Sequence, residues 1–234
     1  MSIPLRTGSA GSLTPADASI DRWSAAAWLA FRDGTTGAST ASASPSPLLG
    51  GSQAGARVAY RLTGSGRTQA YGRVVTAGRR MDGAEAALGL DWQPHPSLPL
   101  RLAMERRQQV IGADARSAFA VFAVAGVSDR ALPAGWRLDG YGAAGVVGAH
   151  QRDRFAEGSL RVSRPVATWG RAHISAGAGS WAATQPGVSR VDVGPTMTLR
   201  LDGVAPRLSL DWRQRVAGSA APDSGLALTL ATDF

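Results

Sequence analysis

The residues that could carry out chemistry in this chain are few and widely spaced. Its 234 residues include three histidines and no cysteine, so thiolate catalysis, disulfides and cysteine-ligated metal sites are excluded. His173 precedes Ser175 by two positions, and in a strand such a pair shares one face, as a base and its nucleophile would. No acid close in sequence would orient His173. A structural polar contact is therefore the favoured interpretation, and a barrel-embedded hydrolase using His173 and Ser175 is the alternative.

The remaining signals for metals and cofactors are weak. His95 lies between two prolines and His150 lies in an expected loop, so the histidines are scattered in a way that does not suit a transition-metal site. The glycine runs at 140–142 and 177–179 are not followed by a helical pattern, which phosphate and dinucleotide loops require. We therefore expect no metal, no cofactor and no catalytic residue.

Arginine is the abundant functional group of this sequence. The chain has 25 arginines, no lysine and 17 acidic residues, which give a formal charge of +8. The arginines are scattered rather than clustered, which argues against a nucleic-acid surface. Many of them alternate with apolar residues, and this alternation identifies the elements that carry them.

The alternation has a period of two and recurs in segments of about ten residues, which is typical of strands. In residues 98–107, three leucines and a methionine occupy even positions, while Arg101, Glu105 and Arg107 occupy odd ones. The turn at 94–97 joins this segment to a similar one at 84–93, which predicts a hairpin. Other clear segments lie at 53–62, 190–201, 207–213 and 226–230, and weaker ones at 23–32, 68–77, 116–127, 136–147, 155–163 and 172–181.

Strand length separates two possible folds. Soluble strands average about 5–6 residues, whereas strands that cross a membrane need about 9–11. The segments match the longer class, and the short turns make consecutive strands antiparallel. We predict an all-β fold, a closed antiparallel transmembrane β-barrel of about 12 strands, since lipid offers no partner to an open sheet edge. A soluble β-sandwich binding module is the alternative.

A barrel of this kind assigns the two faces of each strand to lipid and to the lumen. The residues expected to face lipid are Leu88, Leu90, Leu98, Leu100, Leu102, Met104, Leu199, Leu208, Leu210, Leu226, Leu228 and Leu230. The residues expected to line the lumen are Arg57, Arg61, Glu85, Asp91, Arg101, Glu105, Arg107, Arg116, Arg137, Asp139, Glu157, Arg161, Arg190, Asp192, Arg200, Arg207, Asp211 and Arg213. Such arginines could form a path for anionic or hydroxyl-rich cargo. The favoured alternative is that they pair with the acids and brace the interior.

Aromatic residues at strand ends are expected to mark a membrane interface. Trp23, Trp92, Trp136 and Phe234 all fall at the start or end of an expected strand, and a periplasmic N-terminus would place them together near the inner interface. The domain organisation expected is a flexible segment at 1–21 followed by a single barrel at 22–234 with a long loop at 33–52. The N-terminal residues lack the apolar core of a secretory signal.

The ending at 226–234, LALTLATDF, resembles the C-terminal strand of bacterial outer-membrane proteins, whose final Phe is read by the barrel assembly machinery. Residues 84–107, AEAALGLDWQPHPSLPLRLAMERR, and residues 208–234 further resemble the C-terminal barrel of the bacteriophage adsorption protein A and cellulose-export subunit type. In that family helical repeats precede the barrel. Their absence here suggests a fragment, a misplaced start codon or a barrel that stands alone.

The resemblance implies a bacterial outer-membrane location and a role as an export channel or surface scaffold, in exopolysaccharide export or phage adsorption. It implies no catalytic motif. The expected partners are outer-membrane lipid, the barrel assembly machinery through the C-terminal strand, and polysaccharide or periplasmic export partners, with no nucleic acid.

Overall fold

The structure, a computed structural model, describes residues 22–32, 52–77, 83–111, 117–148 and 153–233. The expected flexible segment at 1–21, nearly all of the loop at 33–52, and the predicted site residues Arg116 and Phe234 lie outside these ranges. Within them the chain is almost entirely strand, apart from one short 3-10 turn at Pro133–Gly135. No helix of the described residues has the length and hydropathy needed to span a bilayer.

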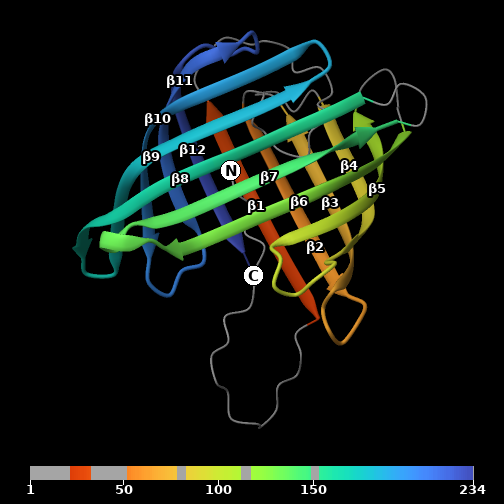
Figure 1. The fold of residues 1–234 in the computed structure, drawn as a ribbon, viewed down its shortest axis with the longest axis horizontal. Helices are drawn as coiled ribbons and strands as arrows, with labels where there is room; N and C mark the ends of the chain where they lie inside the picture. Colours follow the sequence, from red (N-terminus) through yellow and green to blue (C-terminus); the bar gives the residue numbers. More distant parts are fainter. Residues whose placement is uncertain (1–21, 33–51, 78–82, 112–116, 149–152, 234) are drawn as a thin grey trace.

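Twelve antiparallel strands form the wall (Figure 1). They are β1 (Trp23–Arg32), β2 (Gln53–Arg61), β3 (Thr68–Ala77), β4 (Gly83–Trp92), β5 (Leu100–Ile111), β6 (Ser117–Ala131), β7 (Arg137–Val147), β8 (Asp153–Trp169), β9 (Ala172–Gln185), β10 (Val188–Leu201), β11 (Arg207–Gly218) and β12 (Gly225–Asp233). Each strand pairs with its sequence neighbours, and β1 pairs with β12. The sheet is therefore a closed barrel, which confirms the predicted fold and excludes the β-sandwich.

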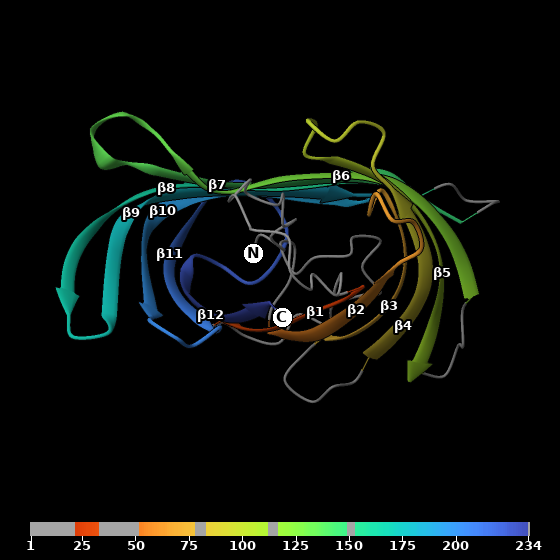
Figure 2. The same ribbon diagram turned by 90° about the horizontal axis from the view of Figure 1, so that it is seen from below.

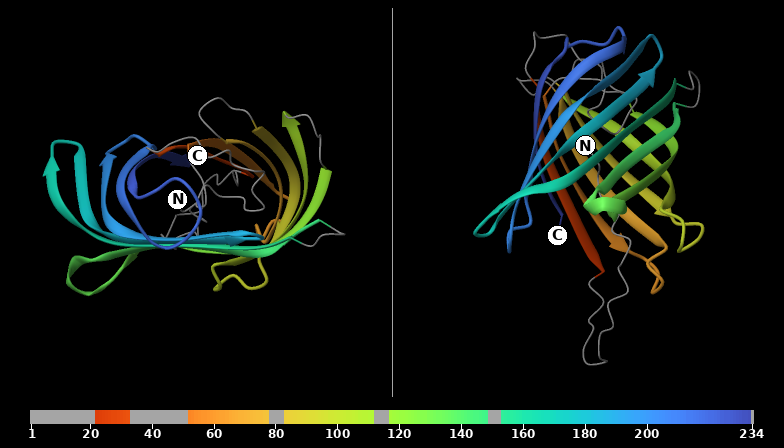
Figure 3. Two further views of the ribbon diagram at one scale, coloured as in Figure 1. Left: turned by 90° about the horizontal axis from the view of Figure 1, so that it is seen from above. Right: turned by 60° about the vertical axis from the view of Figure 1, so that its left-hand side comes forward.

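Closure depends on the first and last strands being in register. Ala26 lies opposite Asp233 and Arg32 lies opposite Ala227, with continuous pairing between them. Viewed from below and from above, the barrel is flattened rather than circular (Figures 2 and 3). Flattening brings opposite walls closer together, so side chains of strands that are not neighbours can meet inside.

Both ends of the described chain lie at one end of the barrel, here called the terminal end. β1 begins there and β12 finishes there, together with the turns at 62–67, 93–99, 132–136, 170–171 and 202–206. This is the lower end in Figure 1. Every second connection therefore faces the terminal end, as an even number of antiparallel strands requires.

Several strands are longer than the sequence pattern predicts, and β8 exceeds its expected range by the most. β6 has 15 residues and β8 has 17, although β8 was expected at 155–163 only. The extra residues of β8 continue to pair with β9 past an irregularity between Pro165 and Ala167. Pro165 cannot donate to the ladder, so a shift of register at this point keeps the pairing going. The apolar alternation stops before the strand does, which is why the prediction was short.

The packing of the barrel is inverted relative to a soluble protein. Leu88 is 73% exposed, while Ala87 beside it is 3% exposed. The same parity exposes leucine, valine and methionine on most strands and directs charged and aromatic side chains inward. Inside, Phe122, Tyr141 and Phe155 pack with alanines of neighbouring strands. Small residues on the inner face make room for these rings: a Cβ on Gly55 would lie 2.2 Å from the Trp28 ring.

Candidate functional site

The barrel interior carries the charged side chains. The predicted lumen residues that are buried are Asp91, Arg101, Glu105, Arg107, Glu157, Arg161, Arg190, Asp192, Asp211 and Arg213. Those that are half-buried are Arg57, Arg61, Glu85, Asp139, Arg200 and Arg207, and Arg137 is exposed at the terminal end. The structure brings most of these residues into two interior clusters and a pocket.

The first group, called the balanced cluster, consists of Arg57, Arg73, Arg101, Arg107, Glu85, Asp91, Glu105 and Glu157. Arg73 binds Glu105 through two nitrogens, with Nε 3.1 Å from Oε2 and Nη2 2.7 Å from Oε1. The same Nη2 lies 2.7 Å from Oε1 of Glu85. Arg107 Nε donates to Glu105 Oε1 at 2.6 Å. A forked guanidinium matches a carboxylate in this two-bond geometry.

Two tyrosines complete the balanced cluster. Tyr71 donates to Glu105 Oε2 at 2.8 Å, and the Arg57 guanidinium lies 4.3 Å from the centre of the Tyr71 ring. Tyr141 donates to Glu157 Oε1 at 2.7 Å and has Arg73 and Glu105 among its charged neighbours. Four arginines face four acids, so this part of the interior is close to neutral. Such a paired network braces the wall.

Asp91 anchors the part of this cluster nearest the terminal end. Arg57 Nη2 lies 2.6 Å from Asp91 Oδ2, and Arg101 also pairs with Asp91. Arg101 further donates to the backbone oxygen of Arg67 at 3.1 Å. These bonds join β2, β4 and β5 to the turn between β2 and β3.

The second group, called the arginine-excess cluster, consists of Arg32, Arg161, Arg190, Arg213, Asp192 and Asp211. Asp211 accepts from Arg161 Nη2 at 2.7 Å and from the Thr196 hydroxyl at 2.6 Å, and Arg213 Nη2 lies 3.6 Å away. Four arginines face two aspartates here. Both aspartates are 0% exposed, so the cluster is removed from solvent.

Asp192 holds the other half of this cluster. It accepts from Arg190 Nε at 2.7 and 2.8 Å and from Arg32 Nη2 at 3.1 Å. Arg190 also donates to the backbone oxygens of Ala220, at 2.7 Å, and of Pro222. Arg190 therefore ties the 219–224 connection onto the end of the barrel opposite the terminal end.

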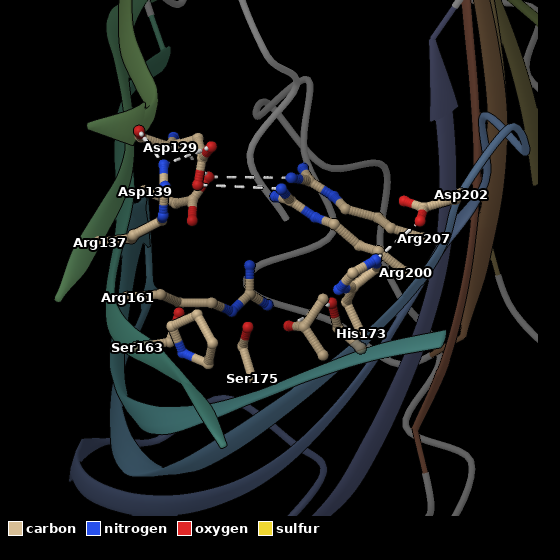
Figure 4. A pocket seen from close by; sticks show the side chains of 13 residues that line it. Asp129, Arg137, Asp139, Arg161, Ser163, His173, Ser175, Arg200, Asp202 and Arg207 are labelled. Carbon is tan, nitrogen blue, oxygen red and sulfur yellow. Dashed lines mark hydrogen bonds and ion pairs between the residues drawn. The ribbon is translucent and has the colours of Figure 1, made fainter. Parts of the chain in front are cut away.

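A pocket of about 290 Å³ opens inside the barrel near the terminal end (Figure 4). It is lined by acids, arginines and hydroxyl groups: Asp129, Arg137, Asp139, Arg161, Ser163, Pro165, His173, Ser175, Thr198, Arg200, Asp202, Arg207 and Ser209. Ser163, Ser175, Thr198 and Ser209 add hydroxyl groups to this charged lining. This mixture can bind hydroxyl-rich and anionic groups, because it offers both donors and acceptors.

Two ion pairs cross this pocket from wall to wall. Arg207 Nη1 on β11 lies 3.8 Å from Asp139 Oδ1 on β7, and Arg200 Nη1 on β10 lies 3.8 Å from Asp129 Oδ1 on β6. Figure 4 shows the two aspartates facing the two arginines. At 3.8 Å these are longer contacts than those of the interior clusters.

His173 pairs with an acid that is distant from it in the sequence. Its Nε2 lies 2.9 Å from Asp202 Oδ2, and its Nδ1 lies 3.4 Å from the Thr168 hydroxyl. Ser175 lines the same pocket, but within the described chain no hydrogen bond joins it to His173. His95 is an exposed turn residue whose Nδ1 lies 2.7 Å from the Ser97 hydroxyl. Across the described ranges, no three His, Asp or Glu side chains are grouped so as to hold a metal.

Several interior residues were missed from the sequence. Arg32, Arg73, Tyr71, Trp28 and Trp181 are all buried inside the barrel. Arg73 and Tyr71 share one strand parity, but Gly72 and the alanines around them blurred the alternation. Trp28 and Trp181 point inward, although bulky aromatic residues suggest a lipid-facing position. The usable signal for Arg32 is its parity opposite to that of Leu29 and Phe31, which are exposed on the outer face.

The outer surface carries the leucines predicted to face lipid. Leu88, Leu90, Leu98, Leu102, Met104, Leu210, Leu226, Leu228 and Leu230 are exposed, and Leu100, Leu199 and Leu208 are partly exposed. Trp23, Trp92 and Trp136 all lie at the terminal end, where Trp23 also contacts Tyr60 with ring centroids 4.8 Å apart. Trp169, at the end of β8, is 87% exposed at the same end.

No protein-family model and no curated protein matches the sequence. Solved structures similar to this chain include one titled bacterial polysaccharide outer membrane secretin, with 10% identity over 91% of this chain and 97% of that chain and a TM-score of 0.45. Another is the β domain of the Bordetella autotransporter BrkA, with 14% identity over 91% and 98% and a TM-score of 0.42. LpxR from Salmonella typhimurium has 11% identity over 90% and 99% and a TM-score of 0.45. Similarity at this level concerns the path of the chain and not the residues of any site.

Proposed function

We propose that this chain is a bacterial outer-membrane β-barrel that acts as an export channel for anionic or hydroxyl-rich material. The observation that carries the proposal is the inverted arrangement around a closed sheet, with apolar side chains outside and ion-paired arginines inside. In water this arrangement would expose large apolar side chains over much of the wall. In lipid it buries them against hydrocarbon and leaves no strand edge unpaired.

The cargo class follows from the lining of the interior. The pocket at the terminal end offers Arg137, Arg200 and Arg207 beside four hydroxyl side chains. Arginine stays charged at any working pH and donates in a rigid fork, which suits carboxylate, phosphate and sugar hydroxyl groups. Exopolysaccharide fits this description, so export of such a polymer is the role we favour.

Reconstitution into planar bilayers tests the proposal. We expect discrete current steps whose reversal potential in a salt gradient shows anion selectivity, because the interior arginines exceed the acids. Addition of an acidic oligosaccharide should block the current in a concentration-dependent way. Cation selectivity, or a current that acidic and neutral oligosaccharides affect equally, would contradict the proposal.

A surface scaffold is the second candidate, and the wall-to-wall ion pairs favour it. Arg207–Asp139 and Arg200–Asp129 bridge the lumen near the terminal end, and the balanced cluster braces it further in. A scaffold of this kind, such as a phage adsorption surface, predicts a folded barrel without measurable conductance. Bilayer recordings therefore separate the two roles directly.

We do not propose an enzyme. The hydrolase alternative gains Asp202 as a partner for His173, yet the Nδ1 atom of His173 faces Thr168 rather than Ser175. We expect purified protein to show no ester or lipid hydrolysis above background. Turnover that disappears in His173→Ala and Ser175→Ala would instead establish the hydrolase.

The C-terminal strand supports the proposed partner, the barrel assembly machinery. β12 closes the barrel against β1 and exposes Leu226, Leu228 and Leu230 on its outer face. Deletion of Phe234 should reduce the amount of folded protein in the outer membrane of a Gram-negative host. Normal assembly of the deletion variant would argue against recognition of this strand. Lipid is the other proposed partner, and polysaccharide and periplasmic export partners follow from the export role.

A further inference from the structure

The arginine-excess cluster has a charge that its own residues do not balance. Arg32, Arg161, Arg190 and Arg213 are each at least nine-tenths buried, and within the described part of the chain only Asp192 and Asp211 pair with them. The charged neighbours of Arg213 include Asp211, Arg161, Arg32 and Asp192, so the two halves form one electrostatic unit. Among the residues that the structure describes, two positive charges of this nearly inaccessible cluster remain without a counter-charge. A buried charge without a counter-charge is strongly unfavourable.

The same cluster contains donors without acceptors. Nε and Nη1 of Arg32, Nε of Arg161, Nε of Arg213 and Nε1 of Trp181 are buried and have no hydrogen-bond partner among the described residues. Burying such a donor is unfavourable unless an acceptor satisfies it. Excess positive charge and unused N–H groups therefore occur together.

Trp181 links the arginines of this cluster. The Arg161 and Arg213 guanidinium carbons lie 5.4 and 4.7 Å from the centre of its ring, and both arginines approach Asp211 Oδ2. Two like charges are thus held beside each other by one carboxylate and one aromatic face. A second anionic group would relieve their repulsion.

The balanced cluster provides an internal comparison. Its four arginines face four acids, and among the described residues Arg57, Arg73 and Arg101 have no buried nitrogen that lacks an acceptor, while Arg107, which binds Glu105, has one. The two clusters occupy the same barrel, so the difference is not a general property of the interior. The balanced cluster is neutral and nearly satisfied, whereas the arginine-excess cluster is positive and has four arginine nitrogens that lack an acceptor among the described residues.

We infer that the arginine-excess cluster is a binding site for an oxyanion group, a phosphate or a carboxylate, held by Arg32, Arg161 and Arg213 with the Trp181 indole. Guanidinium groups bind both oxyanions through charge-assisted hydrogen bonds. This inference rests on the proposed function, because it names the group by which an anionic cargo is recognised inside the barrel. Arg190 positions the site by holding Asp192 and the 219–224 connection.

Isothermal titration calorimetry on the folded full chain in detergent micelles tests the site. Inorganic phosphate and glucuronate are titrated separately at constant ionic strength, so that the two oxyanions are distinguished. We expect saturable binding of at least one of them, weakened at least about tenfold in Arg213→Gln, since a charge-assisted bond is lost. Arg106→Gln, which removes an arginine from the outer face beside Phe119, should bind like the unsubstituted chain.

The outcomes are separable from those of the bilayer experiment. No saturable binding, or equal weakening by Arg213→Gln and Arg106→Gln, overturns the site, and anion-selective current would then leave the export channel standing. Saturable binding without any current keeps the site and removes the channel. If Arg213→Gln fails to fold, Trp181→Phe removes one unsatisfied donor while retaining an aromatic ring, and unchanged affinity in that variant overturns the site.

Discussion

Arg207 on β11 and Asp139 on β7 stand four strands apart in the barrel wall, yet Nη1 of Arg207 lies 3.8 Å from Oδ1 of Asp139. Arg200 on β10 and Asp129 on β6, each one strand earlier in the chain, form the same kind of contact. Contacts of this kind are possible because the barrel is flattened (Figure 2). The terminal end is therefore bridged, whereas deeper arginines are held by shorter and more buried bonds.

The wall-to-wall pair between Arg207 and Asp139 should contribute little to stability. A double-mutant cycle with Arg207→Gln and Asp139→Asn should give a coupling free energy of at most about 1 kcal/mol, because the contact is long and near solvent. Urea unfolding in detergent measures it. The same cycle on Arg161 and Asp211, which are 2.7 Å apart and buried, should give a clearly larger value. Equal coupling in the two cycles would contradict the distinction.

Asp211 should be among the most sensitive positions in the barrel. Asp211→Asn removes the carboxylate that Arg161, Arg213 and Thr196 share, and breaking a buried pair costs about 3–5 kcal/mol. The free energy of unfolding, measured by urea titration, should fall by that amount. Asp223→Asn is the matched control, because Asp223 is largely exposed and pairs only at the surface. A cost for Asp223→Asn as large as that for Asp211→Asn would overturn the ranking.

The depth of a lipid-facing residue in the bilayer should determine how much an introduced arginine lowers the free energy of unfolding. Leu88→Arg, near the middle of β4, should lower the unfolding free energy by about 2–4 kcal/mol in a lipid bilayer, because arginine is costly at the midplane. Leu98→Arg, in the turn before β5 at the terminal end, should cost only about 0–1 kcal/mol. Both leucines are exposed, so a soluble barrel would tolerate the two substitutions equally.

Gly89 should not accept a side chain. A Cβ there would lie 2.7 Å from the Tyr71 ring and 2.7 Å from the Met104 oxygen, so Gly89→Ala should displace Tyr71 from Glu105. Overpacking of this kind costs about 1–3 kcal/mol. Gly64→Ala is the control, since nothing lies within 4 Å of its added Cβ. The free energy of unfolding, measured by urea titration, should be lower for Gly89→Ala than for Gly64→Ala. An unchanged value for Gly89→Ala would contradict this packing.

Much of the wall could be predicted from local sequence, because the alternation that builds a strand is itself local. Residues 98–107 illustrate this: Arg101, Glu105 and Arg107 are inside and Leu102 and Met104 outside, as their parity predicts. Where alanine and glycine dilute the pattern, as around Arg73, parity gave no prediction. The end of β8 was missed because pairing with β9 continues after the apolar residues stop.

Partners across the interior could not be predicted, since nothing local encodes them. His173 and Asp202 are 29 residues apart in sequence, and Arg32 and Asp192 are 160 apart. Both contacts depend on barrel closure and on the stagger between strands. The division of the arginines into a balanced and an excess cluster also depends on these long-range contacts, so it emerges only from the structure.

The most direct test of the membrane-spanning barrel is the collision accessibility of spin labels along β4. The chain has no cysteine, so single cysteines at positions 85–88, 90 and 91 can be labelled without background, and each variant reconstituted into liposomes. We predict high oxygen accessibility at positions 86, 88 and 90 and low oxygen accessibility at 85, 87 and 91, with the water-soluble nickel chelate excluded from position 88. Uniform accessibility along the strand, or nickel access at 88 equal to that at the exposed turn residue 95, would contradict the account.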